Sequence, residues 1–64
     1  MEDYGINELM RFFEYKHLPP NLQEISAPFG KLAREIADRG LSREAAMAVR
    51  KLLEAKDCAV RAVL

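Results

Sequence analysis

The sequence predicts an all-α protein of one domain, spanning residues 1–64, with one short N-terminal helix and two longer helices in an antiparallel hairpin. Two observations predict this fold class. Apolar residues recur at intervals of three and four along most of the chain, as they do on one face of a helix. The alternation of apolar and polar residues that is typical of strands is nowhere sustained. With 64 residues and no internal repeat or linker, the chain has the size of a single small domain.

The first predicted helix is short. Its apolar residues recur at helical spacing and predict a helix over about residues 7–13, namely Ile6, Leu9, Met10 and Phe13. A helix of this length is not stable alone in water. Its apolar face is therefore expected to lie on the longer helices.

The second predicted helix covers about residues 20–39. Five large apolar residues place one continuous seam along it, namely Leu22, Ile25, Phe29, Leu32 and Ile36. Pro20 suits the first helical position, and Gly40 suits the left-handed residue that often ends a helix. Pro28 removes one backbone hydrogen bond inside the helix. Because the seam continues in register across it, we expect a kink at Pro28 rather than two helices.

The third predicted helix covers about residues 43–63, with Ser42 as its N-cap. A stripe of mostly small residues runs along it, namely Ala45, Ala48, Leu52, Ala55, Ala59 and Ala62, with Val49 beside them. The other two predicted helices are not expected to cover both sides of this stripe, so part of it would stay exposed in a monomer. Nine of the 32 hydrophobic residues are alanine, so the core is small for the chain. Both points predict self-association, which would bury further apolar surface.

Charge and hydropathy exclude several classes of protein. Ten basic and ten acidic residues give no net charge, which argues against a general binder of DNA or of anionic membranes. No apolar run approaches the roughly 18 residues of a membrane span, and residues 1–3 do not resemble the start of a signal peptide. A cytoplasmic location is expected, in keeping with a single, reduced Cys58.

The sequence contains no recognisable pattern of catalytic or metal-binding residues. Cys58 and His17 are the only soft ligands, whereas a structural metal site normally needs four. No nucleophile and base stand in a recognisable arrangement, and the three glycines are too scattered to form a phosphate-binding loop. We therefore expect no enzyme activity, no metal and no cofactor.

The segment of residues 13–20 gathers aromatic and cationic groups between two helices, where helix formation does not require them. Tyr15, Lys16 and His17 together suit a planar, anionic ligand such as a nucleotide, through stacking and charge-assisted hydrogen bonds. The alternative is a polar linker with a tyrosine lid. Lys31 lies off the apolar seam and follows Gly30, so it is free to meet a ligand or another subunit. Its alternative role is a surface ion pair with Glu35 one turn later.

Three ordered segments resemble a known family. They are Phe13-x-Tyr15-x-His17-Leu18-Pro19, then Ala27-Pro28-Phe29-x-Lys31-Leu32-Ala33, then the helical run of residues 50–62 that begins Arg50-Lys51-Leu52-Leu53-Glu54-Ala55-Lys56-Asp57. Together they span residues 13–62, most of the chain. On these segments the protein resembles small phage and prophage proteins related to the anti-CBASS cyclic-nucleotide sponges.

The resemblance implies a function and a site. Such sponges are helical homo-oligomers, typically hexamers, that bind cyclic dinucleotides between protomers without cleaving them, and some also hold cyclic trinucleotides. They thereby deny the signal to the defence effectors of the host, in the host bacterial cytoplasm. The resemblance implies that Tyr15 stacks on a base and Lys31 contacts the nucleotide, with His17 or Lys16 as further contacts to phosphate or sugar. His17, Pro19 and Pro20 replace more polar residues of the best-understood sponges, so the loop can present Tyr15 differently.

Two other functions stay open from the residues alone. The alanine-rich third helix suits a helical interaction module that binds a protein and no nucleotide. A small DNA-binding regulator is the weaker alternative, because the chain has no net charge and no helix with several outward side chains suited to base edges.

Overall fold

The computed structural model describes residues 2–64, which form helices joined by short connections. Helix α1 spans Ile6–Met10 and continues into a 3₁₀ turn, η1, over Arg11–Phe13; α2 spans Pro20–Arg39 and α3 spans Arg43–Ala62. The described residues contain no strand, which confirms the all-α prediction. None of their helices is long and apolar enough to cross a membrane.

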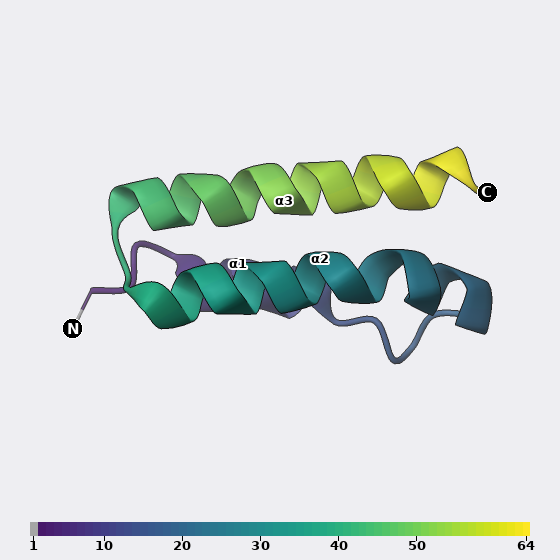
Figure 1. Cartoon of the computed structure of the whole chain (residues 1–64), viewed down its shortest axis with the longest axis horizontal. Coiled ribbons are helices and arrows are strands. Elements are labelled where there is room, and N and C mark those ends of the chain that lie inside the picture. Colours follow the sequence, from purple (N-terminus) through teal and green to yellow (C-terminus); the bar gives the residue numbers. More distant parts are fainter. Residues whose placement is uncertain (1) are drawn as a thin grey trace.

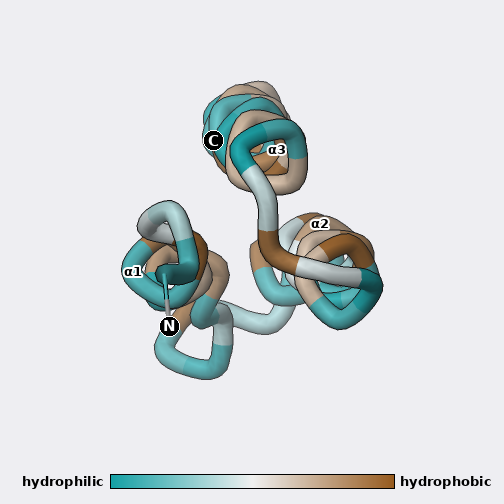
Figure 2. Tube along the Cα trace, turned by 90° about the vertical axis from the view of Figure 1, so that its left-hand side faces the viewer, coloured by the Kyte–Doolittle hydropathy of each residue, from teal (hydrophilic) through white to brown (hydrophobic). Residues whose placement is uncertain are grey.

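The helices form an elongated body of 37 × 18 × 16 Å. Figure 1 shows α2 and α3 side by side, with the chain reversing its direction between them over residues 40–42. Viewed along the long axis, α1, α2 and α3 lie at the corners of a triangle (Figure 2). The connection of residues 14–19, called the connector below, runs from the end of η1 to the start of α2.

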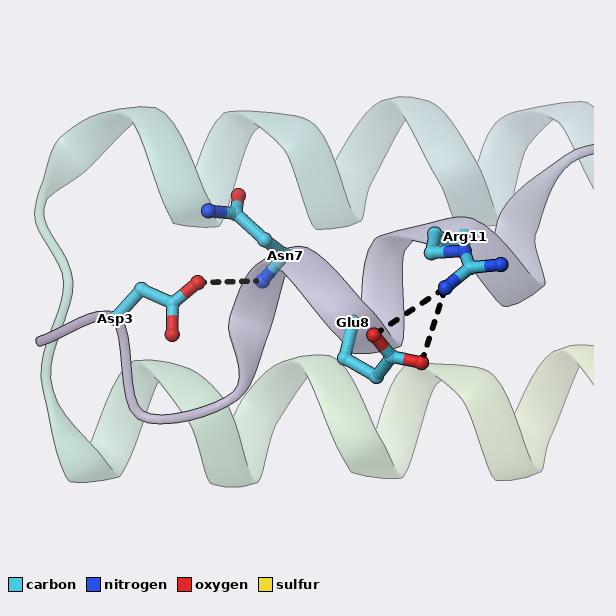
Figure 3. Close-up of polar contacts among 4 residues, drawn as sticks. All are labelled: Asp3, Asn7, Glu8 and Arg11. Carbon is cyan, nitrogen blue, oxygen red and sulfur yellow. Dashed lines mark hydrogen bonds and ion pairs between the residues drawn. The ribbon is translucent and has the colours of Figure 1, made fainter.

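Asp3 organises the start of α1. One carboxylate oxygen accepts the Gly5 N–H at 3.0 Å. The other accepts the Asn7 N–H at 3.2 Å (Figure 3). These two hydrogen bonds, the one from Gly5 first, lower the pKa of the Asp3 carboxyl below its ordinary value. Tyr4 and Gly5 both have positive φ angles, of 56° and 83°, which turn the chain sharply into the helix.

The single helix predicted over residues 7–13 is two segments. It begins at Ile6, and its last three residues form the tighter η1 turn. Arg11 pairs with Glu8 at 3.2 Å on the exposed side of this unit (Figure 3). Ile6, Leu9 and Phe13 are buried, which confirms that this short helix places an apolar face on the longer ones.

Helix α2 begins at Pro20 and continues through Pro28, as predicted, and a kink at Pro28 stays a prediction. The buried face, however, differs from the predicted seam. It consists of smaller residues on average, namely Leu22, Ser26, Ala33 and Ala37. At about 100° per residue this stripe is rotated by roughly 70° from the predicted seam. The prediction is wrong for Leu32, which is 46 % exposed.

The rotation has a physical cause. Phe13 of η1 packs on the side of α2 that carries Gly30, where a Cβ atom would lie only 3.5 Å from Phe13. The buried residues of α2 are those that face the space between α3 and this short N-terminal unit. Small side chains at these positions permit the helices to approach one another closely. Of the predicted seam, Phe29 and Ile36 still pack against the core, whereas Leu32 is exposed. Ser26 lies in this interior with no hydrogen-bond partner for its hydroxyl among the described residues.

The turn between α2 and α3 is partly as predicted. The Ser42 hydroxyl accepts the Ala45 N–H at 3.0 Å, which confirms the N-cap. Gly40 does not adopt the expected left-handed helical conformation, and that prediction is wrong. Its φ of 147° and ψ of 142° extend the chain away from α2 so that three residues suffice to reach α3.

The core joins all helical segments. Its buried members are Leu9, Phe13, Ala33 and Val49, and five partly buried residues pack against them, namely Met10, Phe29, Ile36, Leu52 and Leu53. Val49 is fully buried and forms the centre of the α3 face. The predicted alanine stripe therefore lies to one side of the core, and its members Ala55 and Ala62 are exposed.

Candidate functional site

A shallow groove lies where the start of the connector meets the middle of α2. Its volume is about 270 Å³, and its lining residues are Met10, Phe13, Glu14, Tyr15, Gly30, Lys31 and Arg34. They come from residues 10–15 and from residues 30–34, and the first half of α2 lies between these two regions in the sequence. Tyr15 and Lys31, the two residues to which the resemblance assigns the main ligand contacts, thus line the same groove.

Tyr15 forms the connector side of the groove. It is half-buried and follows the buried Phe13 by two residues. The Leu18 N–H donates to the Tyr15 carbonyl oxygen at 3.0 Å, so the backbone around Tyr15 forms a turn. The phenol ring that this backbone turn carries is a planar surface suited to stacking.

Lys31 and Arg34 form the α2 side. They stand three residues apart, so both lie on one face of the helix. Within residues 2–64, Lys31 has no ion-pair partner within 4.0 Å, so the pair with Glu35 is not formed. Arg34 lies 4.0 Å from Asp38, and both side chains are more than half exposed. Such a surface pair is weak and leaves the guanidinium available to an anion.

Gly30 forms the floor of the groove. A Cβ atom at this position would lie 3.5 Å from both the Phe13 Cβ atom and the Phe13 carbonyl oxygen. The missing side chain therefore lets Phe13 lie close to the α2 backbone. Counting Lys31, Arg34 and Glu14, the groove carries one net positive charge.

The other two predicted site residues lie elsewhere. His17 lines a second groove of about 320 Å³, on the side of the connector that faces the end of α3, together with Phe12, Lys56 and Arg61 among others. Lys16 is exposed and lines neither groove. The four candidate residues therefore divide into one pair, Tyr15 and Lys31, and two separate side chains.

Sequence reasoning missed two cations near the site. Arg34 was identifiable, because its spacing of three residues from Lys31 places it on the same helix face. Lys56 was not, because its contact is made across the fold: its ammonium donates to the Phe12 carbonyl oxygen at 2.8 Å. No local pattern predicts a hydrogen bond between residues 44 positions apart.

An aromatic ring and two cations line the groove, and side chains of these kinds stack on and attract a planar anion. Among residues 2–64, no three His, Cys, Asp or Glu side chains are grouped so as to hold a metal ion. Comparison of the chain with protein families, with characterised proteins and with solved structures gives no match.

Proposed function

We propose that this protein is a phage-encoded sponge, which binds and sequesters cyclic oligonucleotide second messengers without cleaving them. Its effect is to block CBASS-type immunity in the cytoplasm of the host bacterium. The ligands are cyclic dinucleotides, and the resemblance adds cyclic trinucleotides as a second class to test. No turnover is needed, because each bound signal molecule is withheld from the effector by mass action.

One observation carries the proposal: Tyr15 and Lys31 line the same groove, with Arg34 beside them. A cyclic dinucleotide presents planar bases and phosphodiester anions. Stacking on an aromatic side chain contributes about 1–3 kcal/mol per base. Lys31 supplies a point charge for one phosphate, and the planar Arg34 fork suits paired hydrogen bonds to another. The family resemblance of residues 13–62 supports the same ligand.

The size of the groove supports a site completed by a second copy of the chain. Its 270 Å³ lies below the about 300–1,000 Å³ of typical ligand pockets. We propose that another protomer supplies the missing wall. The partly exposed apolar flank of the α2–α3 hairpin, with Leu32 at its most exposed point, lies on the other side of α2 from the groove. Two different self-contacts build an assembly larger than a dimer, and the resemblance points to a hexamer.

Isothermal titration tests the function directly. The full-length protein is titrated with cyclic di-AMP, cyclic di-GMP, 3′,3′-cyclic GMP–AMP and cyclic tri-AMP. Tyr15→Ala and Lys31→Met are each expected to weaken binding about tenfold or more, since 1.4 kcal/mol corresponds to a factor of ten. Ligand released by denaturing the complex is expected to be intact.

Matched controls separate the site from general effects. Tyr4→Ala removes the other tyrosine, and Lys51→Met removes an exposed lysine of α3 that pairs with Glu54 at 3.9 Å. Both are expected to bind as the wild type does. If no compound in the panel gives heat at micromolar concentration, the sponge hypothesis is rejected.

A second function is a helical module that binds a protein partner through α3 and takes no nucleotide. The exposed Ala55 and Ala62 favour it, because small exposed residues on a helix permit close approach of another helix. In that case Ala55→Phe abolishes protection of the phage in infected cells, whereas Tyr15→Ala has no effect. The sponge hypothesis predicts a loss of protection with Tyr15→Ala.

A further inference from the structure

The start of the connector is attached to α3 by one partly buried cation. The Lys56 ammonium donates to the Phe12 carbonyl oxygen at 2.8 Å and lies 3.0 Å from the Asp57 carboxylate. Its side chain is only 12 % exposed, whereas that of Lys51 on the same helix is 68 % exposed. The Phe12 carbonyl belongs to the last turn before the connector, where carbonyl groups lack helical partners and attract a cation.

The end of the connector is attached to α2 by an amide. Gln23 Nε2 donates to the Leu18 carbonyl oxygen at 2.7 Å and lies 3.4 Å from the Lys16 carbonyl oxygen. Between these attachments, the Leu18 N–H closes the turn on the Tyr15 carbonyl oxygen. Tyr15 is therefore flanked by a tie to α3 on one side and a tie to α2 on the other.

We propose that Lys56 and Gln23 are positioning residues, which hold the Tyr15 ring in one orientation beside Lys31 before any ligand arrives. Their importance for binding rests on the proposed function, but the order of Tyr15 is a property of the free protein. A ring that samples many orientations binds with an affinity reduced by the fraction of molecules in the competent one.

The order of Tyr15 is measured on the free, full-length protein. The chain has two tyrosines, Tyr4 and Tyr15, so 3-fluorotyrosine labelling gives two ¹⁹F signals, which Tyr4→Phe assigns. Backbone ¹⁵N relaxation covers the rest of the connector. In the wild type we expect order parameters near about 0.85 at residues 15–18. In Lys56→Met and in Gln23→Ala we expect values below about 0.6 there, and a shifted, averaged Tyr15 signal.

Matched variants separate positioning from a loss of folding. Lys51→Met removes a lysine from α3, and Asn21→Ala removes an exposed amide from the first turn of α2; both are expected to leave the Tyr15 signal unchanged. Gln23→Glu keeps the length of the side chain but not its donor, so it should behave as Gln23→Ala does. Lys56→Arg keeps a cationic donor and should restore part of the order. If Lys56→Met unfolds the protein, Lys56→Arg and the two Gln23 variants decide the question.

Binding provides the second readout. The probe is 3′,3′-cyclic GMP–AMP. Lys56→Met and Gln23→Ala are each expected to weaken its binding about tenfold, because each variant loses one hydrogen bond that holds the connector. An unchanged Tyr15 signal and unchanged order parameters in these variants would overturn the proposal. If the order falls but the wild type binds no cyclic nucleotide, positioning stands and the sponge function fails.

Discussion

The two flanks of the α2–α3 pair differ in what covers them. On one flank, α1, η1 and the connector pack against α2, and the residues in contact there include the small Gly30. On the other flank no segment within residues 2–64 covers the pair, and it carries large side chains, among them Leu32 at 46 % exposure. Figure 2 shows this asymmetry, because α1 occupies only one side of the two long helices.

This difference between the flanks shows that the most hydrophobic positions of the sequence pattern are not always the most buried ones in the fold. Close approach of the N-terminal unit requires small residues on the covered flank, and that approach creates the groove of Tyr15 and Lys31. Leu32 is left on the open flank, 46 % exposed. Burying a leucine from full exposure contributes about 1.5–3 kcal/mol, so roughly half of that remains to be gained there. The covered flank thus forms the groove, and the proposed self-association would bury the open flank.

The largest loss of stability on the covered flank is expected from a substitution of Phe13. Phe13→Ala removes a side chain that is 3 % exposed and lies in the core, and the expected loss is about 3–5 kcal/mol. A domain of this size is stable by about 3–10 kcal/mol, so the variant is expected to lose a large part of its stability and to unfold at a much lower urea concentration, as followed by circular dichroism. Phe12→Ala is the matched control, because Phe12 is 58 % exposed. Equal losses for the two variants would contradict the core described above.

The open flank is tested by Leu32→Lys. A charge on this flank is expected to weaken self-association, so the mass from light scattering should fall while the helix content stays unchanged. Leu64→Lys places the same charge at a site that is 83 % exposed and should keep the mass of the wild type. A wild-type protein that is monomeric at all concentrations would reject both the association and a pocket between subunits.

The floor of the groove is tested by Gly30→Ala. The new Cβ atom would lie 3.5 Å from Phe13, an ordinary contact, and a helical alanine is more stable than glycine by about 0.5–1 kcal/mol. Stability should therefore rise, while the added methyl group should weaken cyclic dinucleotide binding. Gly40→Ala is the control: its φ of 147° disfavours any side chain, so stability should fall. Loss of stability in Gly30→Ala would show that Phe13 cannot adjust to the methyl group.

The smallest expected effect concerns Asp3 and pH. Its pKa is lowered in the folded state, chiefly by the Gly5 N–H, so its contribution to stability is complete above the unfolded value of 3.8. That contribution is lost as the pH falls from 3.8 through the lower folded pKa. An NMR titration should show the Gly5 and Asn7 amide signals moving in this window, and Asp3→Asn should remove the change. Titration of the Asp3 carboxyl at or above 3.8 would contradict it.

The amino-acid sequence by itself determined where the long helices begin. Pro20 starts α2, and the Ser42 hydroxyl caps α3, because a ring without an N–H and a side-chain acceptor act on the nearest backbone groups only. The same local reasoning placed the end of α2 beside Gly40. It missed the Gly40 conformation, because the direction in which the chain leaves α2 depends on where α3 lies.

Only the tertiary structure decided which faces are buried and which candidate residues meet. Periodicity shows that a helix has an apolar face, but the stripe that becomes buried depends on the segments that cover it. In α2 that stripe includes Ala33 and Ala37, whereas Leu32 of the predicted seam is exposed. The sequence singled out Tyr15, Lys16, His17 and Lys31 together, yet the fold joins only Tyr15 with Lys31 and places His17 in another groove. The contact of Lys56 with Phe12 likewise spans 44 positions. Helix ends follow from interactions between near neighbours in the chain, whereas a binding site depends on distances that only packing defines.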